Sequence, residues 1–188
     1  MTETAVQSMA GHLLLAMPDM PDPRFHRSVL LLCVHDHGGA LGIALGEPMR
    51  GVSLHHLLSS FDLAIGDVAD STVLAGGPME PQRGFVLHSR DWSTSDSHVV
   101  SEGVALTGSL DILNAIARGE GPRHYLVALG YAGWGAGQLE RELAAPGWYI
   151  SQANPRRLFD VSPEQRWATA FALEGIDPAM LASSSGHA

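Results

Sequence analysis

Arginine, histidine and glycine residues cluster around two apolar runs in the middle of the chain. Gly76 and Gly77 end the run STVLAGGP, and Arg83 and His88 lie in RGFVLHS a few residues later. A guanidinium group makes paired hydrogen bonds with carboxylates and phosphates, so Arg83 together with Arg27 could form an anion-binding pocket. The alternative is a tight hairpin in which the arginine and histidine side chains pair with nearby acidic residues.

A glycine-rich segment, ALGYAGWGAGQLERELA (128–144), follows a strand-like run and leads into a helix-like one. The dinucleotide-binding spacing G-x-G-x-x-G fails here, because Gln138 stands at the third glycine position. The Walker spacing fails too, since Ala136 stands where that motif needs lysine. Exposed N–H groups at the helix start could still bind an anion. We predict instead that the glycines allow positive φ angles and close packing against Tyr131 and Trp134.

These two segments predict one ligand-binding group, with no metal ion and no cofactor. The ligand that arginine favours is a small anion. The predicted residues are Arg27, Gly76, Gly77, Arg83, His88, Tyr131 and Trp134.

Cys33, His35 and His37 alternate along an apolar run, and thiolate and imidazole groups are ligands for zinc or iron. Residues two apart in a strand share a face, but they stand roughly 6.5 to 7 Å apart, which hinders one metal ion from binding all three. A structural cysteine with surface histidines is the better interpretation. No Gly-x-Ser-x-Gly nucleophile motif occurs. We expect no enzyme, and the alternative is a small-molecule hydrolase or redox enzyme that uses the Cys33 and His88 region.

The 188-residue chain contains no lysine: its 11 basic side chains are all arginines, and its formal net charge is −9. Chemistries that need lysine, such as Schiff-base catalysis and Walker-type phosphate binding, are therefore excluded. An acidic chain also binds DNA poorly, because DNA binding depends on cations that neutralise phosphates. Direct nucleic-acid binding is not expected.

The single cysteine, Cys33, cannot form an internal disulfide, which favours a reducing compartment. The N-terminal stretch MTETAVQSMAG carries no basic residue, and the apolar LLLAM that follows is too short for a signal-peptide core or a membrane span. We expect a cytoplasmic protein without a membrane segment.

Strand-like and helix-like segments follow one another without a regular βα repeat, which predicts an α+β fold. The runs 28–36 and 40–48, joined through His37-Gly38-Gly39, predict a β-hairpin. Ser53 and Ser109 each precede apolar residues at helical spacing and predict helix N-caps.

Near the C-terminus, Ser162-Pro163-Glu164-Gln165 is typical of a capping box at a helix start. Trp167 and Phe171, one turn apart in that helix, should face the core. We expect one domain over residues 11–182, with a flexible N-terminus (1–10) and a C-terminal tail (183–188).

Several of these segments resemble the AlgH/YqgE family of bacterial proteins. The matching stretches are GHLLLAMP, FHRSVLLLCVHD, AGGPMEPQRGFVLHS, ALGYAGWGAGQLERELA, WYI and the closing GHA. The resemblance covers nearly the whole chain from about Gly11 onward. It implies a single α+β domain, in which a bifurcated, mostly antiparallel sheet folds into a pseudo-barrel flanked by helices. One departure is Gly46-Glu47-Pro48, where relatives tend to carry Asn-x-Pro, so no ligand role of that Asn carries over to this chain.

The family is often labelled as transcriptional regulators. No helix-turn-helix pair is evident in this chain, and its net charge argues against DNA contact. We therefore expect a regulator that acts through a protein partner or a small anionic ligand rather than through DNA.

Overall fold

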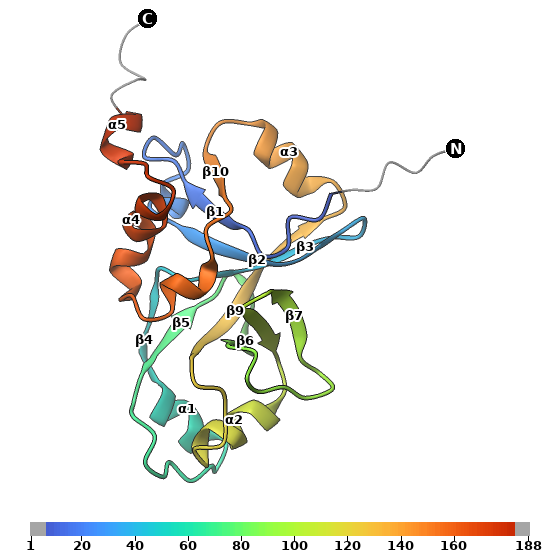
Figure 1. Ribbon diagram of the computed structural model, residues 1–188, viewed down its shortest axis with the longest axis vertical. Coiled ribbons are helices and arrows are strands. Elements are labelled where there is room, and N and C mark those ends of the chain that lie inside the picture. Colours follow the sequence, from blue (N-terminus) through green and yellow to red (C-terminus); the bar gives the residue numbers. More distant parts are fainter. Residues whose placement is uncertain (1–6, 183–188) are drawn as a thin grey trace, which may run out of the picture.

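Strand β9 (Tyr125–Gly135) is the strand at which the sheet divides. The protein is described by a computed structural model that covers residues 7–182. Strand β9 pairs antiparallel with β3 and β6 and parallel with β5. Its first half lies in the lower branch of the sheet and its second half in the upper branch (Figure 1).

The upper branch runs in the order β10-β1-β2-β3 and then joins β9, and all its neighbouring strands are antiparallel. These strands are β1 (Leu13–Ala16), β2 (Val29–Asp36), β3 (Gly39–Ala44) and β10 (Trp148–Ser151). The predicted hairpin is confirmed as β2 and β3. Its ladder contains a β-bulge: Leu32 pairs with Gly42 and Val34 with Leu41, which leaves Cys33 as the extra residue.

The lower branch runs β9-β6-β8-β7, with β5 on the other side of β9 and β4 beside β5. These strands are β4 (Pro48–Ser53), β5 (Thr72–Ala75), β6 (Met79–His88), β7 (His98–Ser101) and β8 (Val104–Thr107). The runs that carry the predicted glycines and Arg83 are β5 and β6. They do not pair as a hairpin, because β9 lies between them.

Three of the helices, α1, α2 and α4, begin where the sequence predicts them. They are α1 (Leu54–Ser60), α2 (Leu110–Ala117), α3 (Gln138–Ala144), α4 (Pro163–Leu173) and α5 (Pro178–Ala182), with 3₁₀ turns η1 (Pro23–Phe25) and η2 (Pro155–Leu158). Ser53, Ser109 and Ser162 are all N-cap residues, as predicted, but only the Ser53 side chain accepts a capping hydrogen bond, from the His56 amide. The predicted capping box is therefore correct in position and wrong in its side-chain bonding.

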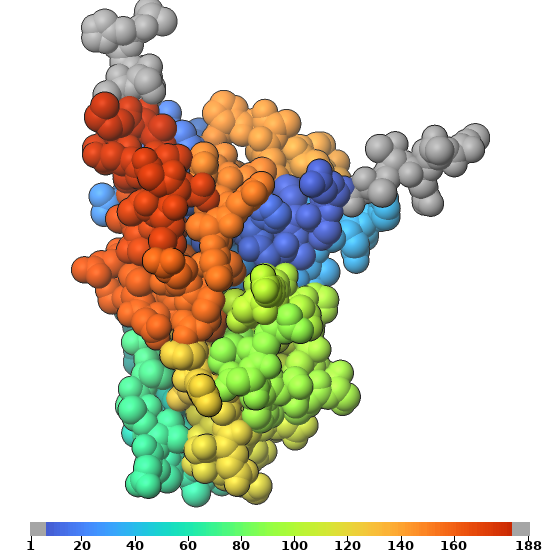
Figure 2. Space-filling view, in the orientation of Figure 1, coloured from blue at the N-terminus to red at the C-terminus, as the bar shows by residue number. Residues whose placement is uncertain are grey.

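The helices lie around the two branches of the sheet. Helices α1 and α2 lie together at the base, α3 lies at the top, and α4 and α5 form one flank of the upper half (Figure 1). The space-filling view shows α4 and α5 as a continuous surface along that flank (Figure 2). No helix between residues 7 and 182 has both the length and the apolar character needed to span a membrane.

Buried side chains form three clusters against the sheet. The largest includes Ile43 and the two aromatic residues of α4, Trp167 and Phe171, whose rings lie 5.1 Å apart, so their predicted inward orientation is confirmed. The second contains Ile112 and lies between the lower branch and helices α1 and α2. The third contains Leu139 and packs α3 against the other face of the upper branch.

Glycines allow two backbone segments to pass very close to one another. A Cβ on Gly130 would stand 2.4 Å from the Gly77 carbonyl oxygen, and a Cβ on Gly76 would stand 2.3 Å from that of Gly130. Gly130 lies inside β9 with φ 77°, and Gly137 (φ 69°) directly precedes α3. The predicted glycine-rich turn is therefore mostly strand. The predicted positive φ is confirmed for Gly130 and Gly137 but not for Gly133 and Gly135. The predicted packing on Tyr131 is confirmed at Gly133, where a Cβ would stand 3.4 Å from the ring, whereas Gly130 packs on Gly77.

The sheet and helices form a single α+β domain whose mostly antiparallel sheet curls into a half-barrel, as predicted. Residues 1–6 of the predicted flexible N-terminus lie outside the described residues, as do the predicted tail 183–188 and the closing GHA. Ser8 and Met9 contact the end of β2. The Met9 N–H donates to His35 Nδ1 at 3.0 Å, and the Ser8 hydroxyl donates to the His35 carbonyl oxygen at 3.0 Å.

Candidate functional site

Four of the predicted ligand-binding residues are neighbours where β5, β6 and β9 meet. The Gly77 backbone contacts that of Tyr131, since a Cβ on Gly77 would lie 2.1 Å from the Tyr131 carbonyl carbon. Gly76 contacts Gly130 one residue earlier on β9. Arg83 reaches the same place from β6 through Glu80.

Arg83, Glu80 and Tyr131 form a small hydrogen-bonded cluster. Arg83 Nη1 lies 3.2 Å from Glu80 Oε2. Hydrogen bonds from the Tyr131 hydroxyl and from Arg83 hold the pKa of the Glu80 carboxyl below its usual value, and the bond to Glu80 raises the pKa of Tyr131. The Arg83 guanidinium also lies over the Phe85 ring, 5.1 Å from its centre. An acidic partner for Arg83, which the sequence left as an alternative to a ligand, is therefore present.

Arg27 lies apart from this cluster. It adopts a left-handed backbone conformation (φ 53°) just before β2, and its guanidinium lies 5.0 Å from the centre of the Trp167 ring. The cavity beside it is lined by Trp167, Asp177 and other residues of α4 and α5, and it does not include Arg83. The structure does not bring the two arginines into one pocket.

His88 is enclosed at the far end of β6 and is 0% exposed. Its Nδ1 donates to the Ser89 carbonyl oxygen at 2.9 Å, and its Nε2 accepts from the Thr107 hydroxyl at 2.8 Å. Thr107 in turn lies 2.8 Å from the Ser97 hydroxyl. Burial lowers the pKa of His88, so it is a neutral member of a buried hydrogen-bond chain.

The bulge in β2 separates Cys33 from His35. Cys33 faces the cluster of Ile43 and Phe171, whereas His35 faces α3, where its Nε2 lies 2.8 Å from Glu140 Oε1. The shared face that would let Cys33, His35 and His37 bind one metal ion does not form, because the extra residue reverses the alternation. The predicted structural cysteine is buried, but of the two predicted surface histidines only His37 is exposed, because His35 is buried under α3. Among residues 7–182, no three His, Cys, Asp or Glu side chains are grouped so that they could hold a metal ion.

The enzyme alternative is not supported. Cys33 is 0% exposed, and burial raises the pKa of its thiol to about 12. A reactive cysteine must ionise near neutral pH and contact its substrate, and Cys33 does neither. His88 is equally inaccessible and is already bonded through both ring nitrogens.

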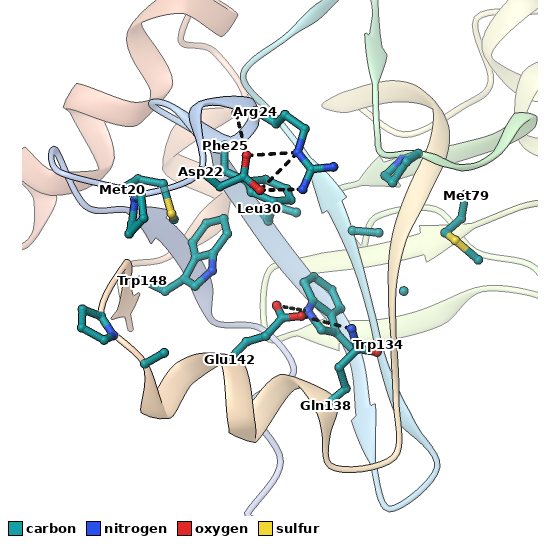
Figure 3. Close-up of a pocket in the computed structure, with 16 residues that line it drawn as sticks. Met20, Asp22, Arg24, Phe25, Leu30, Met79, Trp134, Gln138, Glu142 and Trp148 are labelled. Carbon is teal, nitrogen blue, oxygen red and sulfur yellow. Dashed lines mark hydrogen bonds and ion pairs between the residues drawn. The ribbon is translucent and has the colours of Figure 1, made fainter.

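A pocket of about 470 Å³ opens on the upper half of the molecule, between η1, β9, α3 and β10 (Figure 3). Trp134, from β9, and Trp148, from β10, form two of its walls. Phe25 packs edge-on against Trp148, with ring centres 5.6 Å apart, and Leu30 lies at the back. Trp134 is the one member of the predicted group that lines this pocket.

The sequence positions Trp134 through a strand pair and a glycine. Trp134 is paired with Ala40 of β3, and its ring lies against Gly42 two residues along, where a Cβ would stand 3.2 Å from the indole. Helix α3 begins directly after the strand and returns over it. Gln138 and Glu142 lie one turn apart on α3, so the Gln138 side chain can hold Glu142, which reaches Trp134.

A carboxylate is fixed on the pocket wall. The Trp134 indole N–H donates to Glu142 Oε2 at 2.8 Å, and the Gln138 amide donates to Glu142 Oε1 at 3.1 Å. Across the pocket, Asp22 accepts three hydrogen bonds from the Arg24 side chain, which lower the pKa of Asp22 (Figure 3). Because Arg24 is already paired with Asp22, the lining carries one carboxylate, that of Glu142, with no cationic partner in the pocket.

Two flexible thioethers, Met20 and Met79, lie at opposite ends of this pocket (Figure 3). Methionine adapts its shape to different partners and is common at binding surfaces. The pocket therefore offers aromatic faces, an adaptable apolar rim and a fixed negative charge. No pair of groups in it is arranged as nucleophile and base.

Sequence reasoning missed most of this pocket. Its lining comes from η1, β9, α3 and β10, which are far apart in the chain, and nothing local shows that they converge. The signal that existed was the spacing of Trp134, Gln138 and Glu142, each four residues from the next, which carries the indole–carboxylate bond across the strand–helix junction.

Comparison with known proteins assigns the chain to a family. A family model described as AlgH-like matches residues 13–179. A UPF0301 protein of Rhizorhabdus wittichii is 49% identical over 184 residues, covering 98% of this chain and 99% of the relative. A UPF0301 protein of Novosphingobium aromaticivorans is 51% identical over 180 residues, covering 96% and 97%.

Solved structures agree with this assignment. The solution structure of the AlgH protein from Pseudomonas aeruginosa matches with a TM-score of 0.76 and 37% identity, over 100% of both chains. A crystal structure of a protein from Corynebacterium diphtheriae has the same fold, with a TM-score of 0.71 at 16% identity over 91% of this chain and 90% of that one. The chain described here belongs to the AlgH-like family.

Proposed function

We propose that this chain is a regulatory binding protein that acts through a protein partner, and that a cationic side chain of the partner enters the pocket between Trp134 and Trp148. The observation that carries the proposal is the Glu142 carboxylate, held between the Trp134 indole and Gln138 on an aromatic wall. A guanidinium or ammonium group is attracted both to the faces of tryptophan rings and to a carboxylate.

The charge of the whole chain supports this choice of partner. Its formal net charge is −9, so a basic segment is attracted from a distance and an acidic one is repelled. The same charge supports a regulator that does not contact DNA itself. The regulatory part of the proposal comes from the family resemblance, and the proposal requires no cofactor and no metal ion.

The proposal includes a cytoplasmic location, which the lone, unpaired thiol of Cys33 supports. A small anionic ligand is a second proposal for the effector. It is supported by the half-exposed guanidinium of Arg83, although Glu80 already pairs with that group.

The pocket can be tested with a minimal probe, acetyl-arginine amide, and its matched neutral analogue, acetyl-glutamine amide. In an NMR titration, the arginine probe should shift the indole N–H signals of Trp134 and Trp148, and the glutamine analogue should not. Glu142→Gln keeps an acceptor for the indole but removes the charge. This substitution should weaken the binding of the arginine probe by about threefold to tenfold, as expected for the loss of a partly exposed ion pair beside a cation–π contact.

Glu164→Gln, an exposed acid on α4 outside the pocket, is the matched control and should leave binding unchanged. A partner recovered with the wild-type chain should be lost with Trp134→Ala and with Glu142→Gln and retained with Glu164→Gln. Equal binding of the two probes, or equal effects of the two glutamate substitutions, would reject the cationic anchor.

A further inference from the structure

A second apolar cavity lies at the opposite end of the molecule, between α1, α2 and strands β6 and β9. It has a volume of about 250 Å³ and is lined largely by apolar side chains, among them Leu57, Leu113 and Leu129. Phe61 and Leu110 line it as well and remain 45% and 49% exposed. Since α1 and α2 lie at the base and α3 at the top (Figure 1), this cavity is separate from the aromatic pocket.

Another cavity of about 360 Å³ adjoins the apolar one, and we call it the polar cavity because Arg83, Asp96 and His98 line it. The two share Phe85, Gly108 and Ser109 in their linings. Arg83 and His98 line the polar cavity and not the apolar one. The two cavities therefore adjoin at these three residues, and the second one carries a guanidinium group.

Ser109 lies where the two cavities adjoin, and its hydroxyl group makes no hydrogen bond with the described residues. It is the N-cap residue of α2, yet its side chain makes no capping hydrogen bond. Its Oγ is buried and has no hydrogen-bond partner among the described residues. A buried hydroxyl without a partner is unfavourable, so a rotation of the Ser109 side chain toward an acceptor at the junction would be favourable. The first N–H groups of α2 would stabilise the same acceptor.

We propose that the two cavities join over the exposed Gly108 into one cleft, and that this cleft binds a carboxylate with an apolar chain of medium length. The chain lies between α1 and α2, and the carboxylate lies at Ser109 and Arg83. A cavity of about 150 Å³ accepts one benzene ring, so a cavity of this size accepts one acyl chain. The guanidinium group lies at one end only, which sets the direction of the ligand.

Acidic side chains near Arg83 disfavour anions that have no apolar chain. Asp96 lines the same cavity, Glu80 pairs with Arg83, and Asp111 lies in the first turn of α2. A small anion therefore gains little there, and the apolar chain supplies most of the binding free energy. Each buried methylene adds about fourfold in affinity, so a long chain binds where a short one does not.

This inference does not rest on the partner docking proposed above, because the two sites share no residue. It does extend the expectation of a small anionic ligand at Arg83 by naming the ligand's chemical class.

The test is a titration of the isotope-labelled chain with sodium octanoate, followed by the backbone amide signals of Gly84, Gly108 and Leu113. Octanoate should shift these signals and leave the Trp134 indole signal in place. Butanoate, which has the same head and a short chain, should not bind. Octanamide, which keeps the chain and loses the charge, should bind about tenfold more weakly than octanoate.

Three variants separate the parts of the site. Arg83→Gln should weaken the binding of octanoate about tenfold, so that octanoate and octanamide bind equally. Arg50→Gln replaces an exposed arginine on β4 and should leave the binding of octanoate unchanged. Ser109→Ala should weaken octanoate about fivefold without loss of stability, since the side chain makes no cap bond. Gly108→Leu should block binding, because Gly108 is exposed and its Cβ would lie 3.7 Å from the Phe85 ring at the junction.

The variants are first compared with the wild-type chain by circular dichroism, so that a loss of binding is read only from folded protein. Equal binding of octanoate and butanoate, or signals that move at the aromatic pocket instead, would overturn the apolar half of the site. Binding of octanoate that neither Arg83→Gln nor Ser109→Ala weakens would overturn the carboxylate half.

Discussion

Single polar side chains decide how this fold responds to pH, and His88 is the clearest case. It is fully buried, donates to the Ser89 carbonyl and accepts from Thr107. Burial lowers its pKa below the ordinary value of 6.5, while the Ser89 bond and the charge of Asp91 offset part of that effect. The unfolded chain therefore takes up a proton at His88 more readily than the folded protein does.

The stabilising contribution of neutral His88 should be complete above the unfolded pKa of 6.5 and should decline as the pH falls from there toward the lower folded pKa. The free energy of unfolding, measured with urea at about pH 7.5 and about pH 5.5, should fall on acidification. In the His88→Gln variant, the free energy of unfolding should fall less on acidification than it does in the wild-type chain. His37→Gln, an exposed histidine in the β2–β3 turn, should keep the wild-type slope. Identical slopes for all three proteins would contradict the assignment.

For single residues, the sequence shows which side chains could bind a ligand better than it shows which of them lie close together in the fold. It correctly selects Arg83, Gly77 and Tyr131 as neighbours, because they lie on segments that β9 joins. It groups Arg27 and His88 with them, although each has another partner. Residues around the aromatic pocket escape notice because their convergence depends on how four distant segments pack.

Between elements, the crossing of Gly76, Gly77 and Gly130 holds the branch of the sheet together. Gly130→Ala would require an L-residue at φ 77° and a Cβ 2.4 Å from the Gly77 carbonyl oxygen. We expect it to lower the free energy of unfolding by about 2 to 4 kcal/mol. Gly51→Ala is the control. Its φ of 74° is nearly the same, but no atom lies within 4 Å of the added Cβ, so only the conformational cost of about 1 kcal/mol remains.

Urea unfolding of the two variants measures the difference. A cost for Gly130→Ala no greater than that for Gly51→Ala would show that the two backbones can separate without loss.

Local chemistry predicts the starts of α1, α2 and α4 and the β2–β3 hairpin, since caps and turns depend on neighbours in the chain. It fails where packing decides. Strand β9 continues through Gly130 because β3 and β6 hold it on either side, and strand β7 forms on β8 although its sequence has no long apolar run. The bulge at Cys33 follows from the pairing with β3, which the sequence of β2 alone does not reveal.

Across the whole molecule, β9 couples the upper and lower halves. The cluster of Ile43 spans both branches, since Phe85 and Leu106 of the lower branch belong to it, and the cluster of Ile112 lies in the lower branch. Residues of β9 belong to both clusters. Strand β9 is also the strand that pairs with both branches of the sheet. We therefore expect the described domain to unfold in one cooperative transition.

A matched pair of substitutions tests this coupling. Ile43→Ala and Ile112→Ala each remove a side chain that is 0% exposed, and each should cost about 2 to 5 kcal/mol. Tryptophan fluorescence reports mainly on the upper half, where Trp134, Trp148 and Trp167 lie, and circular dichroism reports on the whole. In both variants, the unfolding midpoints measured by fluorescence and by circular dichroism should decrease by the same amount. A fluorescence midpoint that stays in place in Ile112→Ala would show that the halves unfold separately.

The ladder of strands ends at β10 and at β7, each four residues long, and the side branch ends at β4, which begins with Pro48. Because the edge strands are short and the proline has no N–H group, a neighbouring chain finds few backbone groups with which to form hydrogen bonds. A molecule built around so much sheet is thereby protected from edge-to-edge aggregation at high concentration.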